Sequence, residues 1–288
     1  MEINELNKNA MGGTELMQNR LHSSVPADLL EKFQIIPTRV RELDPNKFRI
    51  LWVHDLPNDP ETFNALGNGK WDRFHKIVFV SNHQMQQCIA AYHIPWSRCC
   101  VIANAITPIE DHNKDTDKVN FIYHTTPHRG LNILVSVFDK LAEEFDNIHL
   151  DVYSSFEIYG WRERDQEFKD LFEYCDKHEK ITNHGTVSND EIRSALQKSH
   201  IFAFPSIWTE TSCLSLIEAM SAKNICIHPN LGALYETAAN MTVMYQFHED
   251  INHHAGIIYN ICKQIIPSIH NDNVKAGLIT QKNYAKLS

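Results

Sequence analysis

Two glutamates stand out in this chain as side chains that could bind a polar ligand. Glu210 and Glu218 have seven residues between them and follow a short apolar run, 201–204, that reads as a buried strand. From Ser212 onward apolar residues recur at helical spacing, and Glu218 belongs to a separate polar stripe that faces away from the core. We therefore expect Glu210 in the turn before a helix and Glu218 about 9 Å beyond the helix start.

A strand–turn–helix junction of this kind can bind an anion together with a sugar. Free backbone N–H groups and the helix dipole favour an anion at the helix start, and a carboxylate accepts hydrogen bonds from sugar hydroxyls. The alternative is structural: Glu210 would interact only with the dipole, and Glu218 would be a solvated helix residue. Cys213 near the helix start could also be an activated thiolate. Glu210 beside it and the lack of a neighbouring histidine in the sequence argue against that hypothesis.

Arg129 is a further candidate, because it precedes a second predicted helix, 131–145. A cation is disfavoured at a helix N-terminus. The placement is explained if the guanidinium and the helix start share an anion such as phosphate, which a guanidinium can bind with two hydrogen bonds. A surface arginine paired with an acidic side chain is the common alternative.

Two more candidates lie in the first half of the chain. Gly12 and Gly13 precede a predicted helix, 14–21, where glycines let the backbone approach a ligand closely. His54 ends a predicted strand, 49–54, and ligands bind at the carboxyl ends of strands in open α/β sheets. The structural alternatives are a simple turn at the glycines and a hydrogen bond from His54 to Asp55 or to backbone, since most of the 17 histidines must be structural or exposed.

Alternating strands and helices must position these residues. Strands are predicted at 33–40, 49–54, 76–81, 101–103, 119–124, 148–154, 181–185, 201–204 and 225–228, with helices between most of them, and a loop region is predicted over 59–69. This alternation predicts doubly wound parallel sheets. We expect an N-terminal domain over 1–107, a linker over 108–118, a C-terminal domain over 119–265 and a helical tail over 266–288.

Composition limits the classes of function. The chain has 288 residues, a net charge of −9, 43% hydrophobic and 22% charged residues, so a soluble globular protein without a general nucleic-acid surface is expected. Seven cysteines without a C-x-x-C pair fit a reducing cytosol. With no apolar run long enough for a membrane span and a polar start that is no signal peptide, we predict a cytoplasmic location.

The two glutamates, followed by Ala219 and Met220, resemble the E-x7-E signature of retaining glycosyltransferases of the GT-B architecture (glycosyl transferases group 1, glycosyltransferase family 4-like). That family commonly has Glu-Gly-Phe-Gly-Leu before the second glutamate, whereas residues 211–214 here read Thr-Ser-Cys-Leu and lack both glycines. The resemblance covers roughly residues 11–264. It implies two Rossmann-like domains that face a cleft, in a shortened form: the first strand of the N-terminal domain is missing or very short, so this domain is reduced.

The resemblance also implies roles for individual residues. Arg129 matches a lysine that contacts the donor diphosphate, and His124 stands where the family has an arginine, which could weaken phosphate binding or make it pH-dependent. The loop with His184 and Val187 would lie against the nucleotide base. The implied catalytic residues are His54, Arg129 and Glu210. The implied donor-binding residues are Gly12, Gly13, His124, Arg129, His184, Val187, Glu210, Ser212, Cys213, Leu214 and Glu218.

The function implied is transfer of a sugar from a nucleotide-sugar donor to a hydroxyl of a glycan, lipid or small molecule, with retention of anomeric configuration. The resemblance implies no metal and no cofactor, in agreement with the lack of an Asp-x-Asp motif, and peripheral membrane contact is compatible with it. The alternative is a catalytically degenerate module that binds a nucleotide sugar or glycan without turnover. The lost glycines, His124 and the shortened ends favour that alternative.

Overall fold

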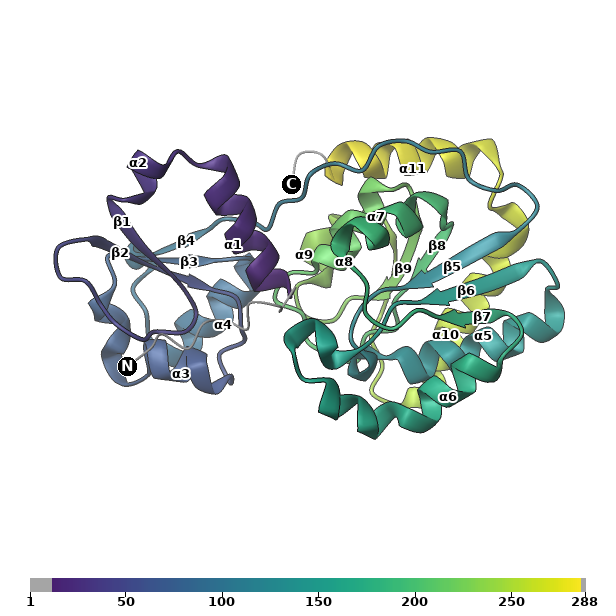
Figure 1. Ribbon diagram of the computed structural model, residues 1–288, viewed down its shortest axis with the longest axis horizontal. Helices are drawn as coiled ribbons and strands as arrows, with labels where there is room; N and C mark the ends of the chain where they lie inside the picture. Colours follow the sequence, from purple (N-terminus) through teal and green to yellow (C-terminus); the bar gives the residue numbers. More distant parts are fainter. Residues whose placement is uncertain (1–11, 286–288) are drawn as a thin grey trace. The chain divides into compact units, whose positions relative to one another are not determined.

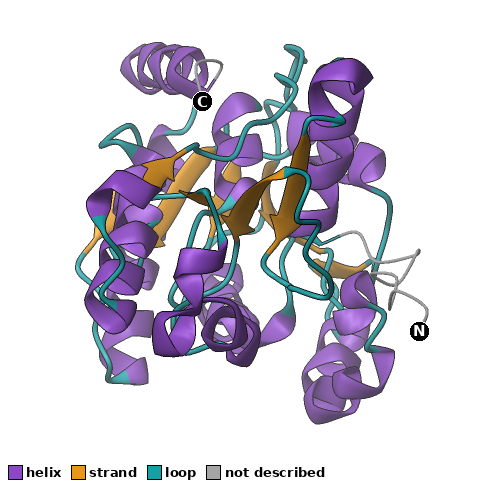
Figure 2. Ribbon diagram, turned by 90° about the vertical axis from the view of Figure 1, so that its left-hand side faces the viewer, coloured by secondary structure: helices purple, strands orange, loops and turns teal. Residues whose placement is uncertain are grey.

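The computed structural model describes residues 12–285. Contacts between Cα atoms divide the chain into two compact units, Met1–Ala105 and Ile106–Ser288, called unit 1 and unit 2 below. In both units helices flank the strands (Figure 1, Figure 2). Each unit is described by itself.

Unit 1 contains a parallel sheet with the strand order β1-β2-β3-β4. Its strands are β1 (Phe33–Pro37), β2 (Phe48–Val53), β3 (Lys76–Phe79) and β4 (Cys99–Val101). The core between sheet and helices includes Leu51, Leu66, Phe74, Ile77 and Phe79, none of which is exposed to solvent. The sequence predicted these four strands with slightly different ends.

The helices described in unit 1 are α1 (Gly13–Ser24), α2 (Ala27–Leu30), α3 (Pro60–Leu66) and α4 (Asn82–Tyr92). Two of these four, α3 and α4, begin after residues whose side chains cap them. The Ser81 hydroxyl accepts a hydrogen bond from the Gln84 N–H at 3.1 Å and so caps the start of α4. The predicted loop region 59–69 is wrong in part, because Asp59 caps α3 and Pro60 occupies its first turn.

Unit 2 contains a parallel sheet with the order β10-β9-β8-β5-β6-β7. Its strands are β5 (Val119–Tyr123), β6 (Ile148–Val152), β7 (Ile181–Asn183), β8 (Ile201–Ala203), β9 (Ile225–Pro229) and β10 (Val243–Tyr245). The chain builds β5, β6 and β7 in one direction, then crosses to the other side of β5 to add β8, β9 and β10. This reversal is typical of doubly wound folds. The sequence did not predict the short strand β10.

Helices cover both faces of the unit 2 sheet. The helices are α5 (Leu131–Glu144), α6 (Lys169–Lys177), α7 (Asn189–Lys198), α8 (Leu214–Ser221), α9 (Leu234–Ala238), α10 (Ile251–Ile265) and α11 (Asp272–Ala285). Helices α5, α6 and α10 lie on one face, and α7, α8 and α11 lie on the other (Figure 1). Buried side chains from both faces form one continuous core.

The predicted linker and the helical tail both pack on unit 2. Ile109 is 2% exposed within the unit 2 core. The Lys114 ammonium group donates hydrogen bonds to the backbone oxygen of Ser199 and to the side chain of Asn224. From α11, the Lys282 ammonium donates to the backbone oxygen of Ile109 at 2.6 Å. Residues 108–118 therefore run along unit 2 as part of its surface and core.

Candidate active site at the carboxyl edge of the unit 2 sheet

The strand order of unit 2 places two loops side by side. Strands β5 and β8 are neighbours in the sheet. After β5 the chain adds strands on one side of the pair, and after β8 it adds strands on the other side. The loops 124–130 and 204–213 therefore leave the same edge of the sheet at the switch point. The loops touch: Gly130 has φ +116°, and a Cβ built there would lie 2.1 Å from the backbone oxygen of Pro205. Ligands bind at such points in open α/β sheets, so this edge is the candidate site.

Arg129 and Glu210 form a buried ion pair at this edge. Their side chains, 81 positions apart in sequence, share a short hydrogen bond, and the Arg129 Nε donates to the Thr126 hydroxyl at 3.1 Å. The Arg129 side chain is 20% exposed and that of Glu210 5%. Burial acts to lower the pKa of Arg129, but the Glu210 carboxylate outweighs it and raises that pKa. Two of the predicted catalytic residues thus meet. The acidic partner that the structural alternative gave Arg129 is present as Glu210, although the pair is buried rather than on the surface.

A third loop, after β9, holds the backbone of Glu210. The Ala233 N–H donates to the Glu210 carbonyl at 2.8 Å. Gly232 has φ +61°, and a Cβ there would lie 2.6 Å from both the nitrogen and the oxygen of Glu210. Any side chain at Gly232 would therefore displace Glu210, which makes this glycine part of the support of the ion pair.

Glu218 lies one turn into α8 and is buried. The helix begins at Leu214 rather than at Ser212, so Glu218 is about 6 Å from its start. The prediction that Glu218 faces away from the core as a polar residue is corrected: it is 4% exposed. The reason is that α7 packs over it, with the Asn189 side-chain amide 3.3 and 3.4 Å from its two oxygens and an Arg193 nitrogen 3.7 Å away.

The predicted anion site lies at the start of α8. Ser212 is partly buried, Cys213 occupies the cap position, and Leu214 is the first helical residue. Cys213 makes no side-chain cap hydrogen bond. Burial raises the pKa of the Cys213 thiol. A side chain that is 5% exposed and has a raised pKa does not fit the hypothesis of an activated thiolate.

His124 follows β5 and is buried against α8. The Ser215 hydroxyl donates to its backbone oxygen at 3.3 Å, and its ring lies 4.9 Å from that of Phe202. The buried Nε2 of His124 has no hydrogen-bond partner among residues 12–285. Burial lowers the pKa of His124 to about 3, so the ring is neutral near neutral pH. A pH-dependent phosphate contact through this ring is therefore not expected above pH 5.

His184 and Val187 lie in the loop after β7. The His184 ring stacks on Tyr153 with 4.2 Å between centroids and an angle of 5°, and its Nε2 is 2.7 Å from a carboxylate oxygen of Asp151. His184 is exposed, and Val187 is partly buried. The stacked pair gives this loop a flat, fixed face next to the carboxyl end of β6.

The remaining predicted site residues belong to unit 1. Gly12 is the buried cap residue of α1, and Gly13 is its exposed first residue. His54 follows β2: its backbone N–H donates to the Thr38 hydroxyl at 2.9 Å, and its ring lies 4.6 Å from that of Trp52. Burial lowers the pKa of His54 to about 4, so the imidazole is neutral at pH 7.

Sequence reasoning missed an aromatic cluster beside the ion pair. The Arg129 guanidinium lies 5.9 Å from the Trp208 ring, and His128 contacts Trp208 edge-on at 4.9 Å and stacks on Phe156 at 5.1 Å. Trp208 is 45% exposed. Its position two residues before Glu210 was the available signal. Asn189 and Arg193 were also missed; the signal there was their i, i+4 spacing directly after Ser188, which has Glu191 three positions further on.

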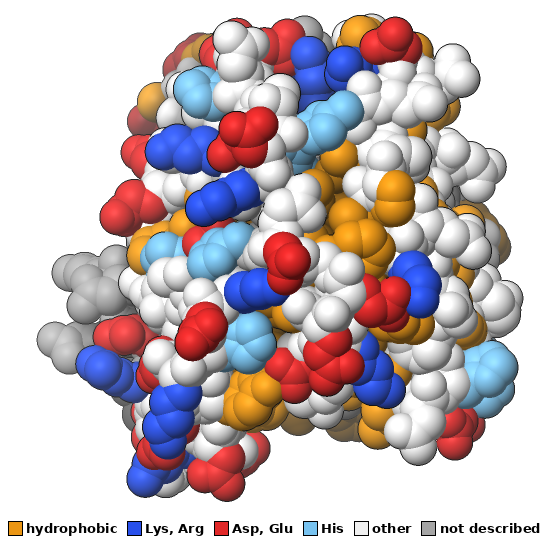
Figure 3. Space-filling view, turned by 90° about the vertical axis from the view of Figure 1, so that its right-hand side faces the viewer, with side chains coloured by type: hydrophobic (Ala, Val, Ile, Leu, Met, Phe, Trp, Pro, Cys, Tyr) orange, Lys and Arg blue, Asp and Glu red, His pale blue; other side chains and the backbone are white. Residues whose placement is uncertain are grey.

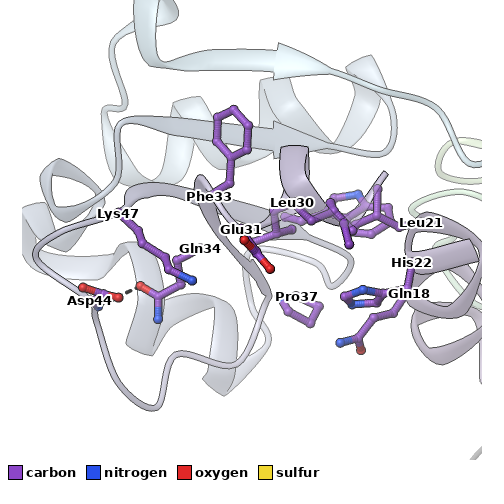
Figure 4. Close-up of a pocket in the computed structure, with 13 residues that line it drawn as sticks. Gln18, Leu21, His22, Leu30, Glu31, Phe33, Gln34, Pro37, Asp44 and Lys47 are labelled. Atoms are coloured by element: carbon purple, nitrogen blue, oxygen red, sulfur yellow. Dashed lines mark hydrogen bonds between the residues drawn. The ribbon is translucent and has the colours of Figure 1, made fainter. Parts of the chain in front are cut away.

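Unit 1 also has an open cavity of about 450 Å³ between α1, α2 and β1 (Figure 4). Polar side chains such as Gln18, Glu31 and Lys47 lie around it, and Leu21 and Leu30 contribute apolar surface. The Asp44 N–H donates to the Gln34 side chain at 2.8 Å on one wall. Of the predicted site residues described in this unit, none lines the cavity.

Across 12–285, no three His, Cys, Asp or Glu side chains are grouped so that they could hold a metal ion. The described helices include none with the length and apolar character to cross a bilayer. All seven cysteines are free. On the face that Figure 3 displays, acidic, basic and histidine side chains are interspersed.

Residues 104–254 match the family model of the glycosyl transferases group 1. The chain belongs to this family. The matched region contains the whole sheet of unit 2 with the Arg129–Glu210 pair and Glu218. No curated protein matched the chain by sequence.

Solved structures resemble this group 1 chain in fold. A glycosyltransferase from Rickettsia africae has a TM-score of 0.64 at 19% identity, with 98% of this chain and 79% of that chain covered. The pneumococcal O-GlcNAc transferase GtfA, solved with UDP and GlcNAc, has a TM-score of 0.64 at 12% identity, with 84% and 49% covered. Anabaena HepE, solved with UDP-glucose, has a TM-score of 0.59 at 14% identity, with 83% and 71% covered.

These similarities confirm the predicted fold class, two parallel α/β units of the GT-B type. The chain spans about half of the length of the pneumococcal transferase.

Proposed function

We propose that this chain transfers a sugar from a nucleotide-sugar donor to an acceptor hydroxyl, with retention of anomeric configuration and without a metal ion or cofactor. The observation that carries the proposal is the buried Arg129–Glu210 pair at the switch point of a group 1 family member. Ionised groups are costly to bury and are concentrated at functional sites. A carboxylate and a guanidinium at this edge suit a ligand that offers hydroxyls and phosphates together.

The reaction replaces one bond at the anomeric carbon by another. The acceptor oxygen bonds to that carbon while its bond to the diphosphate breaks, and the electron pair leaves with the diphosphate. The acceptor proton ends on the released nucleoside diphosphate or in solvent. Charge therefore develops on the diphosphate, and a preorganised cation with nearby N–H groups stabilises it in the transition state.

Each residue has a proposed part in this step. Arg129 and the start of α8 at Ser212–Leu214 would bind the leaving diphosphate, while Glu210 orients both Arg129 and the sugar hydroxyls. Glu218 would accept hydrogen bonds from the ribose. His54 would face the acceptor, where its ring, neutral at pH 7 because burial lowers its pKa to about 4, can accept a hydrogen bond from the acceptor hydroxyl.

The remaining assignments follow the family resemblance. Gly12 and Gly13 would let the backbone approach the donor, and His124 would adjoin its phosphates. The stacked face at His184, with Val187, would lie beside the base. GtfA was solved with UDP and HepE with UDP-glucose, which favours uridine donors as the first to test.

The test is a thermal-shift screen against UDP-, GDP-, ADP- and CMP-sugars, followed by a transfer assay with acceptor glycans. We expect one donor class to raise the melting temperature and to be consumed in the presence of an acceptor. Glu218→Ala and Arg129→Ala should each weaken nucleotide binding by about 1.5–3 kcal/mol, because each removes a charged hydrogen-bond partner. Unchanged affinity in both variants by calorimetry would contradict the site. NMR of the product reports the anomeric configuration, and activity in EDTA tests metal independence.

The same assay distinguishes an active transferase from the alternative, a module that binds a nucleotide sugar or glycan without turnover. Tight nucleotide binding with complete inactivity against every acceptor would favour it. A cytoplasmic location and peripheral contact with a membrane stay predictions, which fractionation of cells that express the full chain would test.

A further inference from the structure

Unit 2 carries two exposed tryptophans on loops that leave the carboxyl edge of its sheet. Trp208 is 45% exposed, and its ring lies 5.9 Å from the Arg129 guanidinium. Trp161 is 42% exposed and belongs to the loop that follows β6. Single exposed apolar side chains are common on protein surfaces, whereas apolar side chains that are joined into one patch mark interaction sites.

A row of packed groups joins the two tryptophans. His128 meets Trp208 edge-on with 4.9 Å between ring centroids and stacks on Phe156 at 5.1 Å. The Arg164 guanidinium lies 4.2 Å from the centre of the Phe156 ring and 5.7 Å from that of Trp161. These five residues, called the aromatic row below, start beside the buried ion pair and continue into the loop after β6.

Hydrogen bonds hold the two loops that carry the aromatic row. The Asp165 carboxylate accepts from the Ser155 hydroxyl and, at 2.7 Å, from the backbone N–H of Phe156. In the other loop, the Ser206 hydroxyl donates to the backbone oxygen of Trp208 at 3.0 Å. A surface that is ordered before binding loses little conformational entropy when a ligand packs on it.

A sugar ring has the chemistry that suits the aromatic row. The C–H groups on one side of a pyranose carry small positive partial charges, and they pack well on the negative face of an indole ring. The oxygens of its hydroxyls can accept hydrogen bonds from a guanidinium, which only donates. Arg164 is exposed, so its N–H groups are accessible to a ligand that lies on the row.

A lipid surface is the other ligand that exposed tryptophans suit, and the charge of the loop disfavours it. Residues 155–168 contain two arginines and four acidic residues, which gives this segment a net charge of −2. Proteins that lie on anionic membranes present clusters of Lys and Arg beside their aromatic side chains. A neutral glycan meets no such repulsion, so the observations favour a glycan.

We propose that the aromatic row binds sugar units of the acceptor and that the acceptor of this chain is an oligosaccharide. Trp208 packs on the sugar nearest the reaction, because it adjoins Arg129. Trp161 packs on a unit farther along the glycan. The inference rests on the proposed function and specifies its acceptor. Affinity should therefore rise with the number of sugar units until the glycan reaches Trp161.

The experiment measures glycan binding in the absence of any nucleotide. The full chain is applied to an array of neutral and acidic oligosaccharides, and di- to hexasaccharides of the type that it binds are then titrated by calorimetry. The variants are Trp208→Ala, Trp208→Phe and Trp161→Ala. The matched control is Trp96→Ala, which removes a tryptophan of unit 1 that is 62% exposed.

The two tryptophans should have different effects. We expect Trp208→Ala to weaken the binding of every glycan in the series about tenfold, whereas Trp208→Phe, which keeps an aromatic face, retains most of the affinity. Trp161→Ala should leave the shortest bound glycan unaffected and weaken the longest about threefold to tenfold. Trp96→Ala should bind as the wild type does. If Trp208→Ala does not fold by circular dichroism, Trp208→Leu takes its place.

The contrary outcomes are distinct. A chain that binds no glycan on the array, or whose Trp208→Ala and Trp161→Ala variants bind as tightly as the wild type, overturns the inference and leaves transfer to another acceptor in place. Binding to vesicles of phosphatidylcholine and phosphatidylserine that both variants abolish, without glycan binding, overturns it in favour of a membrane. Glycan binding through the row by a chain that neither binds nor consumes a nucleotide sugar overturns the proposed function alone.

Discussion

The two units are built from the same alternation of strands and helices, yet their described strands are ordered differently. In unit 2 the strand order reverses between β5 and β8, and two loops meet where it reverses. In unit 1 the four described strands follow one another in sequence order, so no such reversal occurs within residues 12–105. A local pattern of strands and helices therefore does not decide where a ligand binds; the order in which strands are added does.

The two units also differ in how far an ion pair in each is exposed to solvent. In unit 2 the Arg129–Glu210 pair has side-chain exposures of 20% and 5%. In unit 1 the Arg98–Asp72 pair, at 3.0 Å, has exposures of 36% and 69%. A buried pair strongly disfavours the loss of one partner, whereas an exposed pair contributes little. The units should therefore respond differently to acid and to substitution.

A fall in pH should produce the largest difference in stability between the two units. Burial lowers the pKa of several histidines far below 6.5, so they stay neutral in the folded chain while the unfolded chain binds protons. Stability is then lost as pH falls from about 6.5 towards 4, by about 2 kcal/mol per fully buried histidine at pH 5. Unit 2 contains three buried histidines of this kind, His124 with a pKa of about 3 and His200 and His228 at about 4. One partly buried histidine in each unit, His128 in unit 2 and His54 in unit 1, has a pKa of about 4 and should contribute less.

Hydrogen exchange resolved by peptide mass spectrometry at pH 7, 6 and 5 measures the opening free energy of each unit in the intact chain. We expect unit 2 to lose several kcal/mol more than unit 1. His228→Gln should reduce the loss in unit 2, because His228 is fully buried between Pro229 and Thr242. Equal losses of opening free energy in the two units would contradict the expected difference between them.

Replacing a glycine by alanine in each unit should give the next largest difference in stability. Gly130→Ala places a Cβ at φ +116° against the Pro205 oxygen, 2.1 Å away, and should destabilise unit 2 by about 4 kcal/mol or more, since strain and a backbone clash add. Gly69→Ala in unit 1 also has a positive φ, +76°, but no atom within 4 Å, so about 1–2 kcal/mol is expected. Urea denaturation measures both, and similar costs would show that the two loops of unit 2 are not in close contact.

Local features of both units were predictable from the sequence. The Ser81 cap of α4, the Ser188–Glu191 capping box and most strands depend on residues a few positions apart. The Asp59–Pro60 signal for α3 was present but was interpreted as a loop, and the short strand β10 was not predicted. The alternation of strands and helices predicted doubly wound parallel sheets, and the family resemblance, which rests on a motif, supplied the GT-B arrangement of two such domains.

Features that depend on distant partners were not predictable. The Arg129–Glu210 contact joins residues 81 positions apart, and it exists because β8 is placed beside β5. The burial of Glu218 depends on α7, which the helical spacing of α8 cannot reveal. His124 is neutral because of burial, which its place in the sequence does not show.

The ion pairs give the smallest of the three effects and the most direct comparison. Arg129→Ala leaves Glu210 buried without its cation and should destabilise unit 2 by about 3 kcal/mol, whereas Asp72→Ala in unit 1 should cost less than about 1 kcal/mol. Double-mutant cycles with Glu210→Ala and Arg98→Ala isolate each pair from other effects of truncation. We expect a coupling of more than about 1.5 kcal/mol in unit 2 and less than about 1 kcal/mol in unit 1. A weak coupling between Arg129 and Glu210 would mean that the two side chains do not act as one charged unit, and the difference between the switch point and the sheet of unit 1 would then lie in loop geometry alone.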